Sequence, residues 1–478
     1  MASKTALNAR NLEALGEARL AELLMEMSEG DGAAQRRLRL ELAGAQGAEE
    51  VAREVRRRLG QVAWARSYVD WWRRRGLVED LETQRRAIAE RVAPEDPAEA
   101  LDLLWQFLAL AGPVHERCDD SDGLVGDLFR EALADLGEVA AAASPDPEGL
   151  AEQALDALQD NGHAQYDGLI AALAPALGEH GLARLEGRIR AWAAMPVGTP
   201  ADAEEVADRA DGVGEKALRE RRSAARLALM DIADARGDAD GFIAQFDAKT
   251  RRAPTVAAAI AHRLLAAGRP EEALAALDAA ETGRWLEPPP EWHAARLEAL
   301  EAVGRGEEAQ AARWARFEAA LSEDDLRAYL KRLPDFEDID AEERAMERVA
   351  RHPDVHAALA FLVRWPALDR AAALARARAD ELDGDPYYIL TPAAEALAER
   401  HPLAATLCLR AMIDFALDRA RSSRYRHAAR HLVECGHLAP RIPDWGAAEP
   451  HGAYLARLRA QHGCKAGFWA AVEEAVGR

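Results

Sequence analysis

Apolar residues recur at three- and four-residue steps through most of the chain, which is the spacing of one buried face on an α-helix. Between residues 11 and 195 the pattern repeats in successive segments, for example at Leu101, Leu104 and Leu108. No stretch alternates convincingly with period two, so the pattern predicts helices and no strands. Proline-containing breaks are expected to separate the helices at residues 93–94, 144–147 and 196–200.

A hexapeptide, Gly-Arg-x-Glu-Glu-Ala, starts at Gly268 and again at Gly304, a spacing of 36 residues. In each copy we expect an apolar helix to end at the glycine, which tolerates a left-handed conformation. The next helix would begin with the two acids, which complement its positive end. A weaker third copy ends at Gly237. This spacing resembles that of tetratricopeptide (TPR) repeats, although the full aromatic pattern of that family is missing.

These patterns predict an all-α protein, an α-solenoid of stacked helical hairpins with TPR-like central repeats. We expect three parts: an N-terminal helical domain (1–195), TPR-like helical repeats (201–321) and a C-terminal helical domain (322–478) that contains a basic, histidine-rich segment. The double proline at residues 196–200 is the strongest boundary signal, because a helix cannot continue through it.

The formal net charge of −22 disfavours non-specific binding to nucleic acid or to an anionic membrane. The last part of the chain differs, because lysine and arginine outnumber acids after residue 400. Four cysteines in 478 residues are too few for a disulfide framework. No run of apolar residues is long enough to span a membrane. We therefore expect a cytoplasmic protein with reduced thiols and no membrane partner.

Two segments near the N-terminus have both a structural and a functional interpretation. The acidic loop at 118–123 departs from a calcium-binding loop at both ends, so helix capping by its aspartates is favoured over a metal or a partner contact. Trp64, Tyr68, Trp71 and Trp72 could stack on a partner, but their spacing favours a core stripe. The arginines at 73–75 would then face solvent and pair with Glu79 and Asp80.

The loop at 160–168 is unusually polar for a chain of Ala-Leu helices. An Asn-Gly turn is followed by His163, Tyr166 and Asp167, which could line a pocket as donor, stacking surface and base. The alternative is a plain turn between helices. Together with Trp285 and Trp292 in the repeat region, these residues are our first candidates for partner contacts.

The segment from residue 419 to 435 carries the most varied chemistry. Its partner-binding candidates are Arg421, Arg424, Tyr425, Arg426 and Arg430. The arginines could bind phosphates or an acidic protein, or they could anchor the acidic body of the same chain. His427, His431 and Cys435 have a helical spacing that could suit zinc, but no paired cysteine motif supports this, so no cofactor is expected.

Several segments together resemble an uncharacterised bacterial helical family, the DUF6880-type proteins: residues 21–27, 67–71, 118–123, 160–168 and 421–435. The chain also resembles the helical flanks of bacterial SWIM zinc-finger proteins, but the SWIM ligand set is absent. No standard catalytic signature occurs in the sequence. We expect a non-enzymatic scaffold that binds a protein or peptide on its concave face. The alternatives are nucleic-acid or phosphate binding by the basic helix around 419–431, and an unrecognised metalloprotein or enzyme.

Overall fold

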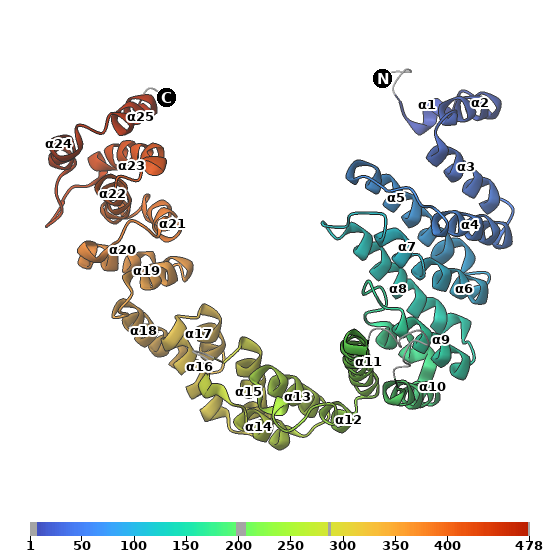
Figure 1. Cartoon of the computed structure of the whole chain (residues 1–478). Helices are drawn as coiled ribbons and strands as arrows, with labels where there is room; N and C mark the ends of the chain where they lie inside the picture. The colour runs from blue at the N-terminus through green and yellow to red at the C-terminus, as the bar shows by residue number, and fades with distance from the viewer. Residues whose placement is uncertain (1–6, 197–206, 285–287, 477–478) are drawn as a thin grey trace. The chain divides into compact units, whose positions relative to one another are not determined.

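The structure, a computed structural model, describes residues 7–196, 207–284 and 288–476, and within these ranges the chain forms helices and no strands (Figure 1). The prediction of an all-α protein is therefore confirmed. The chain divides into two compact units, Met1–Trp292 and His293–Arg478, and each is described by itself. The three-part division expected from the sequence stays a prediction.

Unit 1 is a succession of helices joined by short turns. Its helices are α1 (Ala9–Glu13), α2 (Glu17–Ser28), α3 (Gly32–Gly44), α4 (Ala48–Ala63), α5 (Trp71–Ala87) with a π-helical end η1 (Ile88–Val92), α6 (Pro97–Leu108), α7 (Ala111–His115), α8 (Leu124–Ala143), α9 (Pro147–Gln159), α10 (Leu169–Ala194), α11 (Ala207–Arg236), α12 (Ala239–Ile243), α13 (Pro254–Ala266) and α14 (Pro270–Asp278).

The division between the units falls within α15 (Pro290–Ala302). Unit 2 continues with α16 (Gly306–Ala320), α17 (Glu323–Leu330), α18 (Glu337–Ala350), α19 (Val355–Arg364), α20 (Leu368–Ala377), η5 (Ala379–Glu381), α21 (Tyr387–Leu397), α22 (Pro402–Asp418), η6 (Ser422–Arg424), α23 (Tyr425–Leu438), η7 (Ala439–Arg441), α24 (His451–His462) and α25 (Ala466–Val476).

The core of unit 1 lies between neighbouring helices, since each has one apolar stripe. Helix α6 packs on α8, and α10 packs on α8, α9 and α11. Phe107 and Phe129 are fully buried with ring centroids 5.7 Å apart, and burial of each ring contributes about 1.5–3 kcal/mol. At Gly137 the backbones of α8 and α10 come so close that a Cβ would lie 2.8 Å from the carbonyl oxygen of Ala172. Small residues thus allow the tight stacking that the alanine-rich sequence suggests.

The core of unit 2 is centred on α22, which packs between α20, α21 and α23. Its buried positions include Cys408, Leu409, Ile413 and Leu417. Although this helix is strongly apolar, no described helix is both long and apolar enough to cross a membrane.

The repeated hexapeptide forms the same helix-ending turn in both copies. Gly268 and Gly304 have φ angles of 71° and 78°. The N–H of the next residue, Arg269 or Arg305, donates to the carbonyl of Leu264 or Leu300 at 2.8 Å, as in a Schellman motif. The weaker copy has the same turn, with a φ angle of 66° at Gly237 and a 2.8 Å bond from the next N–H. The prediction of repeated helical hairpins is confirmed.

In both copies of the motif, the arginine stands three residues before the second glutamate, and the two side chains form an ion pair. Arg269 Nε lies 2.7 Å from Glu272 Oε1, and Arg305 Nε lies 2.5 Å from Glu308 Oε1. Each pair spans the first turn of the helix that follows, and because it is exposed to solvent its contribution to stability is small.

The acidic loop before α8 is a capping device, as predicted. The carboxylate of Asp120 accepts hydrogen bonds from the N–H groups of Val125 and Gly126, both at 2.8 Å. These are N–H groups of the first turn, which have no partner inside the helix.

Candidate functional site

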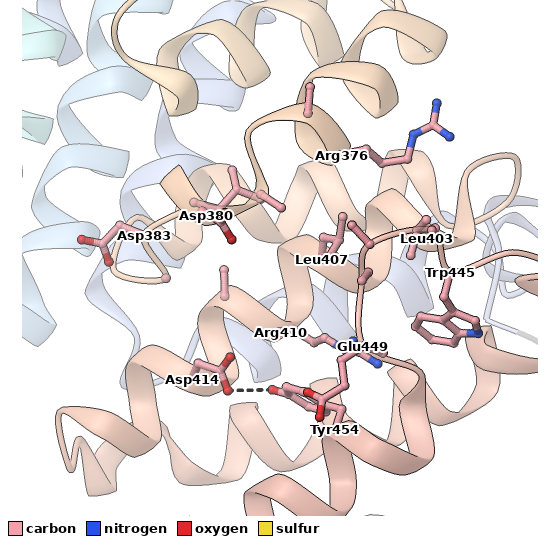
Figure 2. Close-up of a pocket in the computed structure, with 18 of the residues that line it drawn as sticks. Arg376, Asp380, Asp383, Leu403, Leu407, Arg410, Asp414, Trp445, Glu449 and Tyr454 are labelled. Atoms are coloured by element: carbon pink, nitrogen blue, oxygen red, sulfur yellow. Dashed lines mark hydrogen bonds between the residues drawn. The ribbon is translucent and has the colours of Figure 1, made fainter.

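A groove of about 1110 Å³ lies along one face of α22 in unit 2. The turn after α20 forms one wall, and the loop at 444–449 with the start of α24 forms another (Figure 2). Along α22, the groove is lined by Leu403, Leu407, Arg410, Asp414 and Asp418. These positions are three or four residues apart and therefore share one side of the helix.

A hydrogen-bonded cluster closes one side of this groove. The hydroxyl of Tyr454 donates to Asp414 Oδ1 at 2.9 Å, as Figure 2 shows, and Arg457 Nη2 lies 3.4 Å from Asp414 Oδ2. Arg457 also bonds the carboxylate of Glu449 at 3.0 Å. Burial raises the pKa of Asp414, although the bonds from Tyr454 and Arg457 oppose that rise. The pKa of Tyr454 is raised by its own burial and then by the neighbouring carboxylate.

Arg410 is the most unusual residue of the groove, because its charged side chain is only 6% exposed. Its Nη1 donates to the backbone carbonyl of Glu449 at 2.5 Å. The guanidinium lies over the rings of Trp445 and Tyr454, 4.9 and 4.2 Å from their centroids. Its Nε and Nη2 are buried and have no hydrogen-bond partner among the described residues. Burial lowers the pKa of Arg410.

Unit 1 presents a different candidate, four large exposed rings close together in the sequence, which we call the aromatic surface. It consists of Trp64, Tyr68, Trp71 and Trp72, which are 78%, 62%, 70% and 62% exposed. The prediction that these residues form a core stripe is wrong. Helix α4 ends at Ala63 and α5 begins at Trp71, so the helical phase on which the prediction rested is interrupted between them.

The backbone under the aromatic surface is held in place. The N–H of Val69 donates to the carbonyl of Arg117 at 2.8 Å, next to a parallel bridge between Val69 and Cys118. Arg74, only 8% exposed, donates to the backbone carbonyl of Asp119 and pairs with the carboxylate of Asp122. The acidic loop therefore anchors the first turn of α5 as well as capping α8.

The ion pairs and exposure of the arginines at 73–75 agree only in part with the prediction that they face solvent and pair with Glu79 and Asp80. Arg75 is exposed and pairs with Glu79 at 3.1 Å, as predicted. Asp80 instead pairs with Arg58 at 2.5 Å and with Arg36 at 3.3 Å. The prediction that Arg74 faces solvent is wrong, because it occupies the inward side of α5 in line with the buried Leu81.

The polar loop at 160–168 is a turn with its own hydrogen bonds. The N–H of Tyr166 donates to Asn161 Oδ1 at 2.9 Å, and Asp167 accepts from Asn161 Nδ2 at 2.8 Å. The ring of Tyr166 is 6% exposed and lies 6.2 Å from that of Trp105, so it is packed inside unit 1. The exposed His163 stacks on His115 at 4.9 Å. A partner role for His163 and Asp167 stays a prediction.

The two tryptophans expected to contact a partner have different outcomes. The indole N–H of Trp292 donates to the carbonyl of Leu277 at 3.2 Å, which ties the start of α15 to the end of α14. Trp285 lies outside the described residues.

The basic segment is divided between structural and exposed residues. Arg424 pairs with Asp385 at 2.8 Å and packs near Tyr387 and Phe415, so it anchors the acidic chain itself, one of the predicted alternatives. Tyr425 is partly buried against Phe468, at 6.1 Å between ring centroids. The exposed arginines among the predicted binding residues are Arg421, Arg426 and Arg430. Their role in binding phosphate, nucleic acid or protein stays a prediction.

The histidines and cysteine of α23 do not face a common opening. His427 is exposed, His431 is partly buried and Cys435 is fully buried. Burial lowers the pKa of His431 to about 4 and raises that of Cys435 to about 12. Within the described ranges, no three metal-ligating side chains are grouped as a metal site.

Sequence reasoning missed the groove residues Arg410, Asp414 and Tyr454. Arg410 stands within the apolar helix Pro402–Asp418, and an arginine on a buried face was the available signal. Its partners come from a loop about 40 residues later, which the local pattern does not connect to α22.

Comparison with known proteins identifies a family but no function. The sequence profile of a family of unknown function, DUF6880, matches residues 2–471. Comparison with curated proteins gives no match. A solved circular tandem repeat protein with novel repeat topology and enhanced subunit contact surfaces is 15% identical over 99% of this chain and 97% of its own. Its TM-score of 0.14 is too low to support a structural argument. The resemblance to the flanks of SWIM proteins stays a prediction. The match over nearly the whole chain shows that this protein belongs to the DUF6880 family.

Proposed function

We propose that this protein is a non-enzymatic, cytoplasmic helical repeat scaffold that binds a protein or peptide partner through the aromatic surface of unit 1. The supporting observation is that four large rings within nine residues of chain are each more than 60% exposed. Monomeric proteins seldom expose such clusters without a binding role, and tryptophan, tyrosine and arginine dominate the binding energy of many interfaces.

The geometry favours a preorganised site. Trp71 and Trp72 meet edge to face, with centroids 5.6 Å apart at 77°. Because Val69 and Arg74 tie this backbone to the loop after α7, little order would have to be gained on binding. Next to Trp64, a hollow of about 550 Å³ lined by Pro113 and Arg117 could receive an apolar side chain of the partner.

Charges around the rings suggest the chemistry of the partner. Arg66 and Arg73 are exposed and form no ion pair with any described residue. An apolar segment flanked by acidic side chains would satisfy both the rings and the arginines. Arg66, which lines the hollow together with Glu116 and Arg117, and Arg73 would orient such a segment on the aromatic surface.

Photo-crosslinking in the native host tests the proposal. A benzophenone amino acid placed at Trp72 should capture a discrete partner, and Trp71→Ala with Arg73→Glu should abolish that product. The matched control is a benzophenone at Tyr388, which is 70% exposed against 62% for Trp72 but lies in unit 2. A product that forms equally at both positions, or that survives the substitutions, would contradict the proposal.

A further inference from the structure

The groove on α22 contains a buried charge that forms no ion pair with any described residue. The guanidinium of Arg410 is nearly buried, and its one bonded partner is a neutral carbonyl, that of Glu449. The carboxylates of Glu449 and Asp414 act on it electrostatically, but a buried cation whose N–H groups lack acceptors is still costly and calls for a specific explanation. Asp414 is directed to Tyr454 and Arg457 instead.

The unpartnered atoms of Arg410 belong together chemically. The Nε and Nη2 hydrogens lie on the same edge of the planar guanidinium and point in parallel. This is the edge that receives a carboxylate or phosphate through two parallel hydrogen bonds. Arg410 lines the groove, but its Nε and Nη2 atoms are themselves buried, so part of the groove wall must shift for an anionic group to meet this edge.

The rest of the groove selects among anions. Carboxylates around it belong to Asp380, Asp383, Asp414, Asp418, Asp444 and Glu449, against four arginines including Arg410. A dianion such as phosphate would be repelled by this excess of acid. In a ligand that carries both a carboxylate and a cation, the carboxylate would be attracted to Arg410 and the cation to the acidic residues of the groove. Asp414 and Asp418 follow Arg410 on successive turns of the same helix, about 6 Å apart. Asp418 also lies 3.1 Å from His462 Nε2, so a ligand cation would share this carboxylate with the histidine.

We propose that the groove binds a zwitterionic ligand whose carboxylate is held side-on by Arg410 and whose cationic group faces Asp414 and Asp418. The ligand is a free basic amino acid or the C-terminal residue of a basic peptide; both sources present this chemistry. The stacking of Trp445 and Tyr454 on Arg410 keeps the guanidinium in position for the carboxylate. This inference concerns unit 2 and does not rest on the proposed function of the aromatic surface.

Calorimetric titration of the full chain tests this inference. The probes are L-arginine, the peptide acetyl-Ala-Ala-Arg with a free carboxylate, the same peptide as its C-terminal amide, and inorganic phosphate. We expect the free acid or the amino acid to bind at least about tenfold more tightly than the amide, because the amide cannot accept two charge-assisted bonds. Comparing L-arginine with the free-acid peptide distinguishes the two sources.

Variants separate recognition from folding. Arg410→Lys should weaken the free-acid peptide about tenfold or more, because lysine lacks the paired edge. The rim variant Asp418→Asn leaves the buried cluster of Arg410, Asp414 and Tyr454 intact, removes the charge that faces His462, and should weaken the binding of L-arginine by a few fold. Arg430→Lys, outside the groove, is the matched control and should change nothing. Equal binding of acid and amide, tighter binding of phosphate, or no binding of any probe at about 10 mM would overturn the proposal.

Discussion

Gly384 offers a sharp test of how the groove is built. It lies in the turn after α20 and lines the groove against α22. A Cβ at this position would overlap the carbonyl oxygen of Ala411 and lie 2.5 Å from its carbonyl carbon and 2.6 Å from Phe415 Cβ. Its φ angle is accessible to alanine, so only the close approach of the backbone requires glycine.

The cost of Gly384→Ala follows from these distances. Carbon atoms in contact are normally about 3.5–4.0 Å apart, so the turn would have to move about 1 Å away from α22. Part of the obstacle is helix backbone, which cannot rotate aside. Overpacking of this kind costs about 1–3 kcal/mol, and we expect unit 2 to lose this much. For a unit of this size, that corresponds to a fall in melting temperature of about 2–12 °C.

Calorimetry and hydrogen exchange measure the effect of this substitution. We expect the unit 2 transition to shift down and the amides of α21 and α22 to exchange faster. The matched control is Gly452→Ala in α24, where a Cβ meets no atom within 4 Å. Alanine there should leave stability unchanged or raise it by up to about 1 kcal/mol. If Gly384→Ala were as stable as the wild type, the packing described for the groove would be incorrect.

Three further predictions concern His431, the cysteine thiols and Arg74. His431 has a pKa of about 4 in the folded chain against an ordinary value of 6.5, so the unfolded chain binds more protons between these values. Stability should fall as the pH drops from 6.5 to 4, by at most about 3 kcal/mol, and urea titrations of His431→Gln should show a shallower fall. Cys464, the exposed thiol, should react with iodoacetamide much faster than the buried Cys408, whose pKa is raised to about 12; equal rates would show that the core opens readily. Arg74→Ala should destabilise unit 1 by about 1–3 kcal/mol in urea unfolding, since it frees the acidic loop, and an unchanged midpoint would show that this anchor contributes nothing.

The elements that could be predicted from the sequence depend on neighbours along the chain. The turns at Gly268 and Gly304 need only a left-handed residue and a following helix start, and the capping by Asp120 needs only nearby N–H groups. The aromatic surface was misjudged because a helical spacing was counted across Ala63 and Trp71, where one helix ends and another begins.

The groove could not be predicted for a different reason. Arg410, Trp445 and Tyr454 meet only after α22 and α24 have packed, and nothing in the local pattern encodes that contact. An arginine at an apolar helical position indicates an unusual burial, but it does not identify which distant residues surround it.

The most direct test of the proposed function introduces Trp64→Ala/Trp71→Ala into the chain that carries the benzophenone at Trp72, and compares partner capture and stability. Because both rings are mainly exposed, we expect the crosslinked partner to be lost while the melting temperature of unit 1 stays within about 4 °C of the wild type. In contrast, Phe107→Ala should cost about 3–5 kcal/mol as a core substitution. Retention of the partner, or a loss of stability as large as that of Phe107→Ala, would show that the aromatic surface is not the binding site.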